Sequence, residues 1–234
     1  YSVSEAQVDG YTSKVTGDAA NGFTVTNTHE VEKTDVTVTK VWNDANNQDG
    51  KRPGSVKIRL LANGKEVASY DVTGTGNTWT YIFEDVDKYA GGEEITFTVS
   101  EDAVAEYTTS IDQDTLTVTN THETYTTEAT VVKVWDDDNN RDGKRPDELN
   151  VTLSNDTTVT LNEANGWTAT VKDLPVNENG VAIEYTWTEE KLTDGYELTK
   201  TEKDGTVTTL TNSRTIEKTE ATVVKVWDDD SLSL

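Results

Sequence analysis

Three lysines stand in an unusual setting, because each lies in the middle of a run of residues that favours a β-strand. Lys40 lies within residues 36–42, and Lys133 and Lys225 lie within runs of nearly the same composition. Alternate side chains of a strand point to opposite faces, so each lysine shares its face with the apolar residues two positions away. A buried ammonium without a partner costs several kcal/mol or gives up its proton. The pattern therefore predicts lysines whose charge must be paired or neutralised.

A glutamate and an asparagine recur in equivalent settings on two further predicted strands. Glu101 and Glu189 each lie two residues beyond an apolar residue of the same face, and so do Asn120 and Asn212. In the second case this parity selects Glu189 rather than Glu190, although the spacing to the following strand fits either. Each set of strands is therefore expected to direct one lysine, one glutamate and one asparagine into the same apolar interior.

These three residue types together permit one specific reaction. A lysine in an apolar site has a lowered pKa and acts as a neutral, nucleophilic amine. A carboxyl group in such a site can stay protonated and move protons, and an asparagine amide supplies an electrophilic carbon. Attack of the amine on that carbon expels ammonia and leaves a Lys–Asn isopeptide bond. Holding the groups together can lower the barrier by roughly 7–11 kcal/mol.

A buried Lys–Glu ion pair, with asparagine as a hydrogen-bond partner, explains the same pattern without any reaction. Structural ion pairs also perturb pKa values, so the residues alone leave both interpretations open. A turnover enzyme would need a reusable acid–base pair in an open cleft, and the sequence offers no such pair outside these three residue types.

The lysines and asparagines recur at a nearly fixed distance along the chain. Lys133 follows Lys40 by 93 residues, and Lys225 follows Lys133 by 92. The asparagines keep the same spacing from Asn27 onward. Such a period indicates tandem structural units. We expect two complete repeats, residues 32–123 and 124–214, and we call them the first and second repeat. Residues 1–31 are expected to be the end of a preceding repeat, and residues 215–234 the first strand of a following one.

Each complete repeat is rich in threonine and valine and shows the alternation of strands rather than a helical period. Expected strands lie near 36–42, 55–62, 65–71, 77–83, 95–101, 106–111 and 115–120, and near 129–135, 148–154, 157–161, 167–172, 183–189, 196–201 and 206–212. Asn-Gly or Asp-Gly pairs at 63–64, 165–166, 179–180 and 204–205 mark turns. About seven short strands per repeat predict an all-β fold of tandem antiparallel sandwiches.

Composition excludes several classes of function. The 234 residues carry a formal net charge of −24 and contain no cysteine and no methionine. This charge disfavours nucleic acid and anionic membrane surfaces as partners, and no apolar run is long enough for membrane insertion. Disulfides and thiolate metal sites are excluded. Because methionine is also absent from position 1, we expect the chain to be a segment of a longer protein.

The motifs resemble a known family. Residues 40–53 and 133–146 begin Lys-Val-Trp-Asn/Asp-Asp and end Asn-Gln/Arg-Asp-Gly-Lys-Arg-Pro. This run, with the later Tyr/Phe-x-Val/Trp-x-Glu and Val-Thr-Asn-Thr elements, is similar to the Cna protein B-type domains of Gram-positive surface adhesins. The resemblance implies an inverse-immunoglobulin-like sandwich whose first and last strands are joined by an autocatalytic isopeptide bond. Departures are Trp187 in place of valine and Asn212-Ser213-Arg214 in place of Asn-Thr-His.

Carried onto this sequence, the resemblance implies two cross-links. Lys40 would join Asn120 with Glu101 as the catalytic residue, and Lys133 would join Asn212 with Glu189. Treated like disulfides, bonds closing loops of this length would stabilise each repeat by roughly 4–5 kcal/mol against the unfolded chain.

The function implied is a structural stalk of an adhesin on the extracellular, cell-wall-anchored surface of a Gram-positive bacterium. Its partners would be neighbouring repeats of the same protein, with host extracellular matrix bound through other domains. The resemblance implies no enzyme activity beyond the single self-directed reaction, and neither a cofactor nor a metal. The alternative is an adhesive module that recognises a host protein or glycan through loops at the ends of the sandwich.

The partial repeats contain one further set of a glutamate, an asparagine and a lysine in equivalent settings. These are Glu5 and Asn27 near the N-terminus and Lys225 near the C-terminus. Joined head to tail, two chains could bring these residues together. The partial repeats lack most strands of a sandwich, so no core could enclose the reaction. We therefore predict that Lys225 stays unreacted.

Other signals favour structural roles. Residues 138–143 fit the first half of a calcium loop, but the twelfth position is Leu149 rather than glutamate, which favours a turn rich in Asn and Asp. We expect exposed histidines at 29 and 122, and solvated loops at the basic pairs 51–52 and 144–145. The parity places four tryptophans in the cores: Trp42, Trp135, Trp187 and Trp227.

Overall fold

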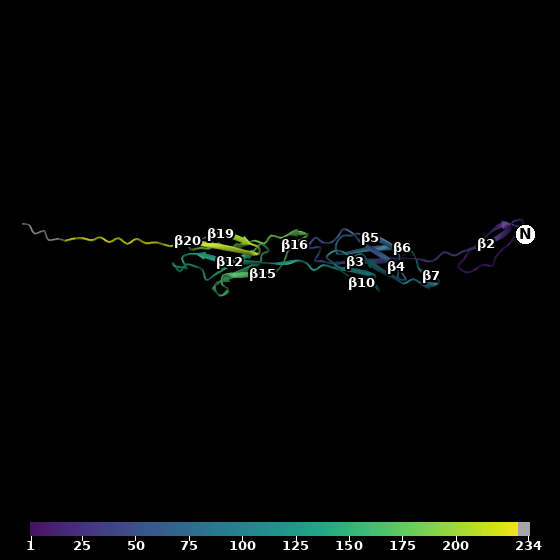
Figure 1. Cartoon of the computed structure of the whole chain (residues 1–234), viewed down its shortest axis with the longest axis horizontal. Coiled ribbons are helices and arrows are strands. Elements are labelled where there is room, and N and C mark those ends of the chain that lie inside the picture. Colours follow the sequence, from purple (N-terminus) through teal and green to yellow (C-terminus); the bar gives the residue numbers. More distant parts are fainter. Residues whose placement is uncertain (229–234) are drawn as a thin grey trace, which may run out of the picture. The chain divides into compact units, whose positions relative to one another are not determined.

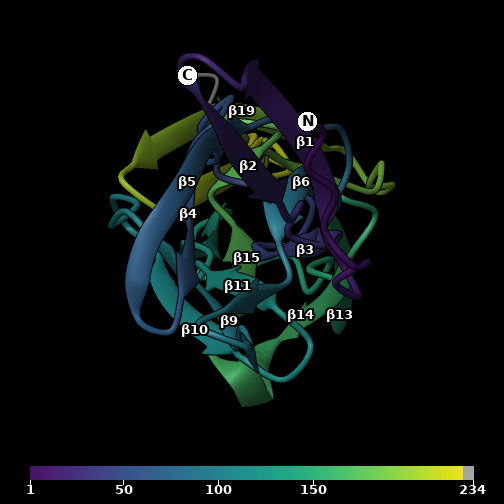
Figure 2. The same cartoon turned by 90° about the vertical axis from the view of Figure 1, so that its right-hand side faces the viewer.

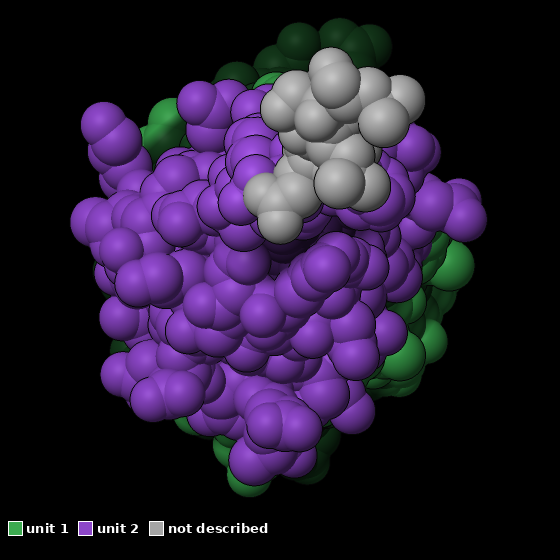
Figure 3. All heavy atoms as spheres, turned by 90° about the vertical axis from the view of Figure 1, so that its left-hand side faces the viewer, with its two compact units in different colours: residues 1–124, 178–181 green, residues 125–177, 182–234 purple. Residues whose placement is uncertain are grey.

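The computed structural model describes residues 1–228, and nearly all of its regular structure consists of β-strands (Figure 1). The chain divides into two compact units, shown in different colours in Figure 3. The first contains residues 1–124 with residues 178–181, and the second contains residues 125–177 with the described residues from 182 onward. The last six residues of the expected partial repeat at 215–234 lie outside the described residues.

The first repeat contains two sheets and one small hairpin. Its longer strands are β3 (Lys33–Asn43), β4 (Val56–Ala62), β5 (Lys65–Val72), β6 (Thr78–Asp87), β9 (Phe97–Glu101), β10 (Thr108–Asp112) and β11 (Thr117–Thr121). One sheet has the order β10-β11-β3-β6, and the other has the order β5-β4-β9. The short strands β7 (Tyr89–Ala90) and β8 (Glu93–Glu94) pair only with each other. Figure 2 shows β4 and β5 running side by side.

The second repeat has the same plan. Its longer strands are β12 (Thr126–Asp136), β13 (Glu148–Leu153), β14 (Thr158–Asn162), β15 (Thr168–Pro175), β18 (Trp187–Glu189), β19 (Tyr196–Asp204) and β20 (Val207–Arg214). They form the sheets β15-β12-β20-β19 and β14-β13-β18. The strands β16 (Asn177–Glu178) and β17 (Val181–Ala182) form a hairpin, and residues 163–165 form a single 3₁₀ turn.

The predicted all-β fold is confirmed, and each of the fourteen expected strands has a counterpart. Asn63 and Gly64 adopt φ values of 50° and 80°, which is the geometry of the tight turn that joins β4 to β5. One detail differs from the prediction, because the strand expected at 183–189 is confined to residues 187–189. The turn predicted at 165–166 is present between β14 and β15, where a 3₁₀ turn ends and Asn162 and Asn165 cap each other's backbone.

The first and last strands of each repeat lie next to each other and run parallel. In the first repeat Lys40 of β3 pairs with Val118 of β11, and Asn120 pairs with Trp42. In the second repeat the corresponding pairs are Lys133 with Leu210 and Trp135 with Asn212. Because side chains alternate along a strand, this register places the lysine and the asparagine on the same face, two positions apart.

Apolar side chains from both sheets of each repeat form one core. In the first repeat Ile58, Leu60 and Val118 are fully buried, and in the second Val131 and Leu161 are. Alternating threonine and valine produce this arrangement, since the valines of one strand face share the interior while the threonines face outward. The glutamate strands, β9 and β18, belong to the sheet opposite the one that carries the lysine and the asparagine.

The two ends of the chain have no such core. The N-terminal strands β1 (Thr12–Asp18) and β2 (Gly22–Thr28) form a hairpin that is exposed on nearly every residue. Residues 215–228 contain no strand, and the valines at 223, 224 and 226 are exposed. Trp227 is 71% exposed, so its predicted place in a core is wrong: the described segment has no neighbouring sheet to pack against.

Candidate cross-linking site

The amine of Lys40 lies in the apolar interior of the first repeat. The Lys40 side chain has no exposed surface, and its Nζ lies 3.5 Å from Glu101 Oε1, in a carboxyl group that is equally buried. The amine also donates to the carbonyl oxygen of Val41 at 3.1 Å and reaches that of Val118 at 3.5 Å. It lies 4.1 Å from the centre of the Trp42 ring. The predicted convergence of lysine and glutamate is therefore present in this geometry.

Asn120 completes the group in an unusual state. It is fully buried, and neither its Nδ2 nor its Oδ1 has a hydrogen-bond partner among the described residues. Leaving two buried polar atoms unpaired costs roughly 1–3 kcal/mol for each. Glu101 accepts a hydrogen bond from Thr109 at 3.3 Å through Oε2, while its Oε1 meets only the lysine. An amide in this state is held by the fold rather than by hydrogen bonds of its own.

The second repeat brings the equivalent residues together with one difference. Lys133 Nζ lies 3.6 Å from Glu189 Oε2 and donates to the Leu210 carbonyl at 3.0 Å. Asn212 donates from Nδ2 to Glu189 Oε1 at 2.6 Å, so the amide already touches the carboxyl group. Parity correctly selected Glu189, because Glu190 instead accepts from the backbone N–H of Asn150.

The second site also lies nearer to solvent than the first. The Glu189 side chain is 8% exposed, whereas that of Glu101 has no exposed surface. A pocket of about 340 Å³ opens beside Glu189 and Asn212, and its wall includes Leu192 and Leu198. Water can therefore approach the carboxyl group of the second repeat more closely.

Burial has the same electrostatic effect on both lysines. It lowers the pKa of Lys40 from 10.5 to about 8, against the opposing influence of Glu101. It lowers the pKa of Lys133 to about 8 against the influence of Glu189. The lysine amine and the glutamate carboxyl group lie close enough for a proton to pass between them. Moving that proton from nitrogen to carboxylate produces a neutral amine and a carboxylic acid beside the asparagine amide.

A buried cluster beside each site was missed by the sequence analysis. Asp44 follows β3 directly, is 2% exposed, and binds Arg52 and the Tyr107 hydroxyl. Asp137, Arg145 and Tyr196 repeat this arrangement. The interpretation of both basic pairs as solvated loops is therefore wrong for their arginines, although Lys51 and Lys144 are exposed. The signal was available in the sequence, because the aspartate and the arginine each recur 93 residues later.

His122 was also misjudged, whereas His29 is exposed as expected. His122 is 7% exposed, and its Nε2 lies 2.9 Å from Asp49 Oδ2 and its Nδ1 2.9 Å from the carbonyl oxygen of Glu106. Both ring nitrogens thus face acceptors, and only the imidazolium form can donate to both. Burial alone would lower the pKa of His122, but these two hydrogen bonds outweigh it and the pKa is raised.

The second repeat places a permanent cation at the same position. Arg214 stands where the first repeat has His122, and its guanidinium contacts Asp142, the counterpart of Asp49. Arg214 also donates to the Asp194 carbonyl at 2.7 Å. The sequence departure at residues 212–214 therefore preserves a positive charge bound to an aspartate and a carbonyl beyond the asparagine.

The residues of the partial repeats are exposed. Asn27 donates to Glu5 at 3.0 Å on the surface of the N-terminal hairpin. Lys225 is exposed and lies 3.4 Å from the ring centre of Trp227. None of the three is enclosed by a core of the kind that surrounds Lys40.

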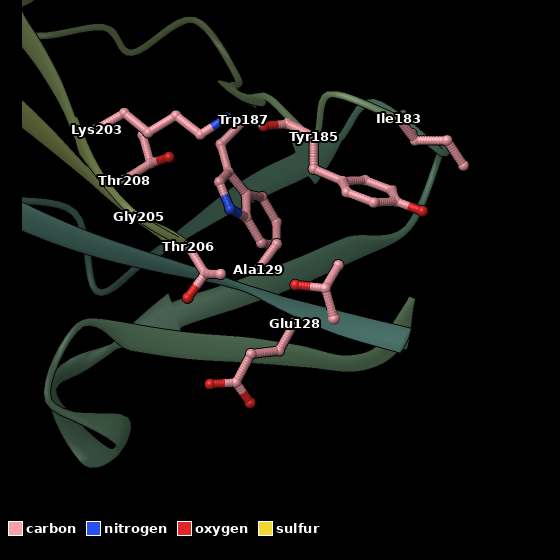
Figure 4. A pocket seen from close by; sticks show the side chains of 10 residues that line it. Glu128, Ala129, Ile183, Tyr185, Trp187, Lys203, Gly205, Thr206 and Thr208 are labelled. Carbon is pink, nitrogen blue, oxygen red and sulfur yellow. Dashed lines mark hydrogen bonds between the residues drawn. The ribbon is translucent and has the colours of Figure 1, made fainter. Parts of the chain in front are cut away.

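A small pocket lies at the end of the second repeat away from its lysine, glutamate and asparagine (Figure 4). It measures about 170 Å³, and Trp187 and Tyr185 form part of its wall beside Lys203 and Glu128. Trp187 is buried as predicted, but its Nε1 has no hydrogen-bond partner. The pocket contains none of the cross-linking residues.

Two further observations concern metal ligands and membrane spans in the described part of the chain. Residues 1–228 contain no cluster of three or more side chains that could hold a metal ion. In the loop that resembles half a calcium site, Asn140 Oδ1 accepts from the backbone N–H of Arg145. Over the same range no helix is long and apolar enough to cross a membrane.

Comparison with known proteins identifies the family. The family model for the Cna protein B-type domain matches residues 1–28, 36–121 and 129–213. The chain belongs to the Cna B-type domain family. The two longer matches are each a Cna B-type β-sandwich, and the three matches in succession show that such domains occur here in tandem.

Similar proteins come from the surfaces of Gram-positive bacteria. The chain is 42% identical over 235 residues to a collagen adhesin of Staphylococcus aureus, covering 98% of this chain and 20% of the adhesin. The chain thus spans about a fifth of the length of that relative. It is also 40% identical to the crystal structure of two B repeat units of the collagen-binding protein of S. aureus. That match covers 90% of this chain and 57% of the other, with a TM-score of 0.45.

A more distant likeness is to the major pilin of Streptococcus pyogenes. It is 14% identical, with a TM-score of 0.35, and the match covers 79% of this chain and 99% of the pilin. The Cna B-type repeats of the collagen adhesin are structural modules, not enzymes.

The buried histidine generates a prediction about pH. The raised pKa of His122 means that its stabilisation of the first repeat is fully present below its ordinary pKa of 6.5 and is lost as the pH rises through the folded-state value. We expect the urea midpoint of a Lys40→Ala chain, which cannot cross-link, to fall over that range. Tryptophan fluorescence at a series of pH values measures it.

The matched control is the same chain with His122→Arg, which copies the residue of the second repeat. Its midpoint should lose this pH dependence, because guanidinium keeps its charge throughout. A midpoint of the histidine chain that stays constant across the range would show that the imidazolium does not stabilise the fold.

Proposed function

We propose that each complete repeat is a segment of an adhesin stalk that stabilises itself with an autocatalytic Lys–Asn isopeptide bond. The observation that carries the proposal is the buried trio, above all Asn120, whose amide atoms have no hydrogen-bond partner beside a lysine of lowered pKa. In an ion pair with a supporting asparagine, the amide would be expected to bind its neighbours. As a reactant, it needs only to be positioned.

The reaction uses only groups present in the repeat. Glu101 accepts a proton from Lys40, and the neutral amine attacks the amide carbon of Asn120. A new C–N bond forms and the amide C–N bond breaks. The carboxylic acid gives its proton to the departing nitrogen, and the resulting carboxylate takes the second proton of the attacking amine. The released ammonia carries that last proton away as ammonium, so the glutamate carboxylate is regenerated. Lys133, Asn212 and Glu189 perform the same steps in the second repeat. The apolar core excludes water, which favours attack by the amine over hydrolysis.

The bond suits a structural role because of where it would lie. In each repeat it would connect the first strand to the last, two parallel neighbours near whose ends the chain enters and leaves the sandwich. A force pulling on the chain would pass from Lys40 directly into Asn120. The residues between them would carry no load. The Lys133–Asn212 bond would protect the second repeat in the same way.

The setting of this function also belongs to the proposal. Relatives of the family are surface adhesins and pilins, so we infer an extracellular place for this segment, with anchoring to the cell wall and any contact with host matrix made by other parts of the parent protein. Neighbouring repeats are its inferred partners. The division into complete repeats at 32–123 and 124–214, with partial repeats on either side, is part of the same proposal.

The intact mass of the denatured chain tests the cross-links directly. We expect it to fall short of the sequence mass by two ammonia molecules. Lys40→Ala and Lys133→Ala should each restore one of the two. The full sequence mass in the unmodified chain would refute cross-linking and leave the trio as a buried polar network.

Lys225→Ala is the matched control for these variants. Lys225 has the same neighbours in the sequence as Lys133 but is exposed, so its removal should leave the deficit of two ammonia molecules unchanged. A covalent ladder of multimers on a denaturing gel, lost in this variant, would contradict the prediction that Lys225 stays unreacted.

The pH dependence of the reaction reports on the shared proton. A Lys–Glu pair that holds one proton is required, and the pair loses that proton near the lysine pKa of about 8. The rate of ammonia loss in chains synthesised in vitro should therefore hold steady from neutral pH up to this pH and decline above it. A rate that instead rises through pH 8 would mean that the neutral amine alone limits the reaction and the glutamate donates no proton.

Stretching single molecules tests the mechanical role. Residues 41–119 lie inside the proposed loop, and about 80 residues extend by roughly 260–290 Å at 3.3–3.6 Å per residue. A Lys40→Ala chain should show one unfolding step that releases this extra length, whereas the unmodified first repeat should not. The same step in the unmodified chain would show that the load is not carried by a covalent bond.

A further inference from the structure

The cluster of aspartate, arginine and tyrosine joins the two elements that carry the reacting groups. Asp44 directly follows β3, the strand of Lys40, and Tyr107 directly precedes β10, which pairs with β11, the strand of Asn120. We call β10–β11 and β19–β20 the asparagine hairpins. The Tyr107 hydroxyl donates to Asp44 Oδ2 at 2.8 Å. This hydrogen bond therefore ties the asparagine hairpin to the end of the lysine strand.

The aspartate is held in place by several donors at once. Arg52 donates to Asp44 from Nε at 3.0 Å and from NH2 at 2.5 Å, and the backbone N–H of Asn47 donates at 2.9 Å. Burial alone would raise the pKa of Asp44, but these partners and Tyr107 outweigh it and the pKa is lowered. Burial and the aspartate also raise the pKa of Tyr107. The hydrogen bond thus joins an ionised carboxylate to a protonated phenol throughout the physiological range.

The cluster contacts the reaction site through one aromatic ring. The ring of Trp42 meets that of Tyr107 edge-on, with ring centres 5.1 Å apart, and its centre lies 5.4 Å from the Arg52 guanidinium carbon. The Lys40 amine lies 4.1 Å from the centre of the same ring. The indole is thus packed between the amine and the cluster, so a shift of the tyrosine would be transmitted to the lysine.

The second repeat reproduces the arrangement in detail. Tyr196 donates to Asp137 at 2.8 Å, and Arg145 donates to the same carboxylate at 2.9 and 2.6 Å. The ring of Trp135 lies 5.1 Å from that of Tyr196 and 4.5 Å from the Lys133 amine. Tyr196 is the first residue of β19, which pairs with the strand of Asn212. The cluster is therefore conserved in geometry between two repeats whose residues beyond the asparagine differ.

We propose that Asp44, Arg52 and Tyr107, and their counterparts Asp137, Arg145 and Tyr196, are positioning residues for the cross-linking reaction. They set the distance between the asparagine hairpin and the lysine strand while the amine attacks. This inference rests on the proposed isopeptide function. It assigns the residues no part in proton transfer, because none of them is placed against the reacting atoms by any contact in the described residues.

Positioning has a large effect on a reaction of this kind. Because the two groups belong to one fold, the rate depends on how often the amine and the amide carbon meet in the right geometry, and a misplacement of about 1 Å can slow a reaction by about 100-fold. Loss of one hydrogen bond to a charged group is a smaller perturbation, and we expect it to slow the reaction roughly tenfold.

The experiment measures the loss of ammonia over time in a chain synthesised in vitro, quenched at intervals and weighed intact. Peptide digestion assigns each cross-link to its repeat. Tyr107→Phe removes the hydroxyl but keeps the ring, and should slow only the first repeat. Tyr196→Phe should slow only the second. In each variant the untouched repeat of the same molecule is the internal control.

Two further variants separate positioning from other effects. Tyr70→Phe removes a hydroxyl from an exposed tyrosine of the first repeat that stacks on Tyr81, and should change neither rate. Asp44→Asn combined with Tyr107→Phe should be no slower than Asp44→Asn alone, because the tyrosine acts through the aspartate.

A purely structural role would give a different result. The Lys40→Ala chain, with and without Tyr107→Phe, shows by urea unfolding whether the first repeat remains folded. If it does, a slower reaction cannot come from unfolding. The pH at which the rate declines should also stay where it is in the unmodified chain, since the Lys–Glu pair is unaltered.

The outcomes distinguish this inference from the proposed function. If the unmodified chain loses no ammonia, the isopeptide function itself fails. If it loses two molecules, but Tyr107→Phe and Tyr196→Phe react at the unmodified rate, the function stands and the positioning role is overturned. A tenfold slowing confined to the altered repeat, with unchanged pH dependence, supports it.

Discussion

The burial of a lysine amine in an apolar core is the constraint on which the rest of each repeat depends. Desolvation of Lys40 is costly, and the fold answers it with Glu101 from the opposite sheet, two backbone carbonyls and the face of Trp42. Glu101 comes from β9 and the Val118 carbonyl from β11, while the Val41 carbonyl and Trp42 belong to the lysine strand itself. Placing them requires the parallel pairing of first and last strands and the close approach of two sheets.

The two repeats meet this requirement with partly different side chains. Asn120 is unpaired in the first repeat, while Asn212 already donates to Glu189 in the second. Thr109 supports Glu101 from the strand opposite Asn120, and the second repeat has Leu198 at the position opposite Asn212. Both repeats retain the buried lysine, the carboxyl group, the buried asparagine and the tryptophan.

The two repeats also place a positive charge at the same position, just beyond the asparagine strand. His122 and Arg214 both place a cation against an aspartate and a backbone carbonyl. The imidazolium loses its charge as the pH rises through its raised pKa, whereas the guanidinium keeps its charge. The repeats therefore share a structural solution but differ in how it responds to pH.

Much of the fold and of the site could be read from local pattern. Strand alternation identified the strands and selected Glu189 over Glu190, because parity depends only on the spacing of neighbouring residues. The cluster around Asp44 and the burial of His122 were missed, because both depend on loops that fold back onto strand ends. No periodicity describes such contacts.

The chain contains one segment twice, in two different tertiary environments. Residues 127–138 and 219–230 have identical sequences, yet the first segment forms most of β12, while residues 219–228 form no strand. Lys133 is buried with a lowered pKa, whereas Lys225 is exposed. The sequence determined which face of a strand the lysine would share with valine and tryptophan. Only the tertiary structure decided whether that face was buried, because desolvation requires the strands of a whole repeat to surround it.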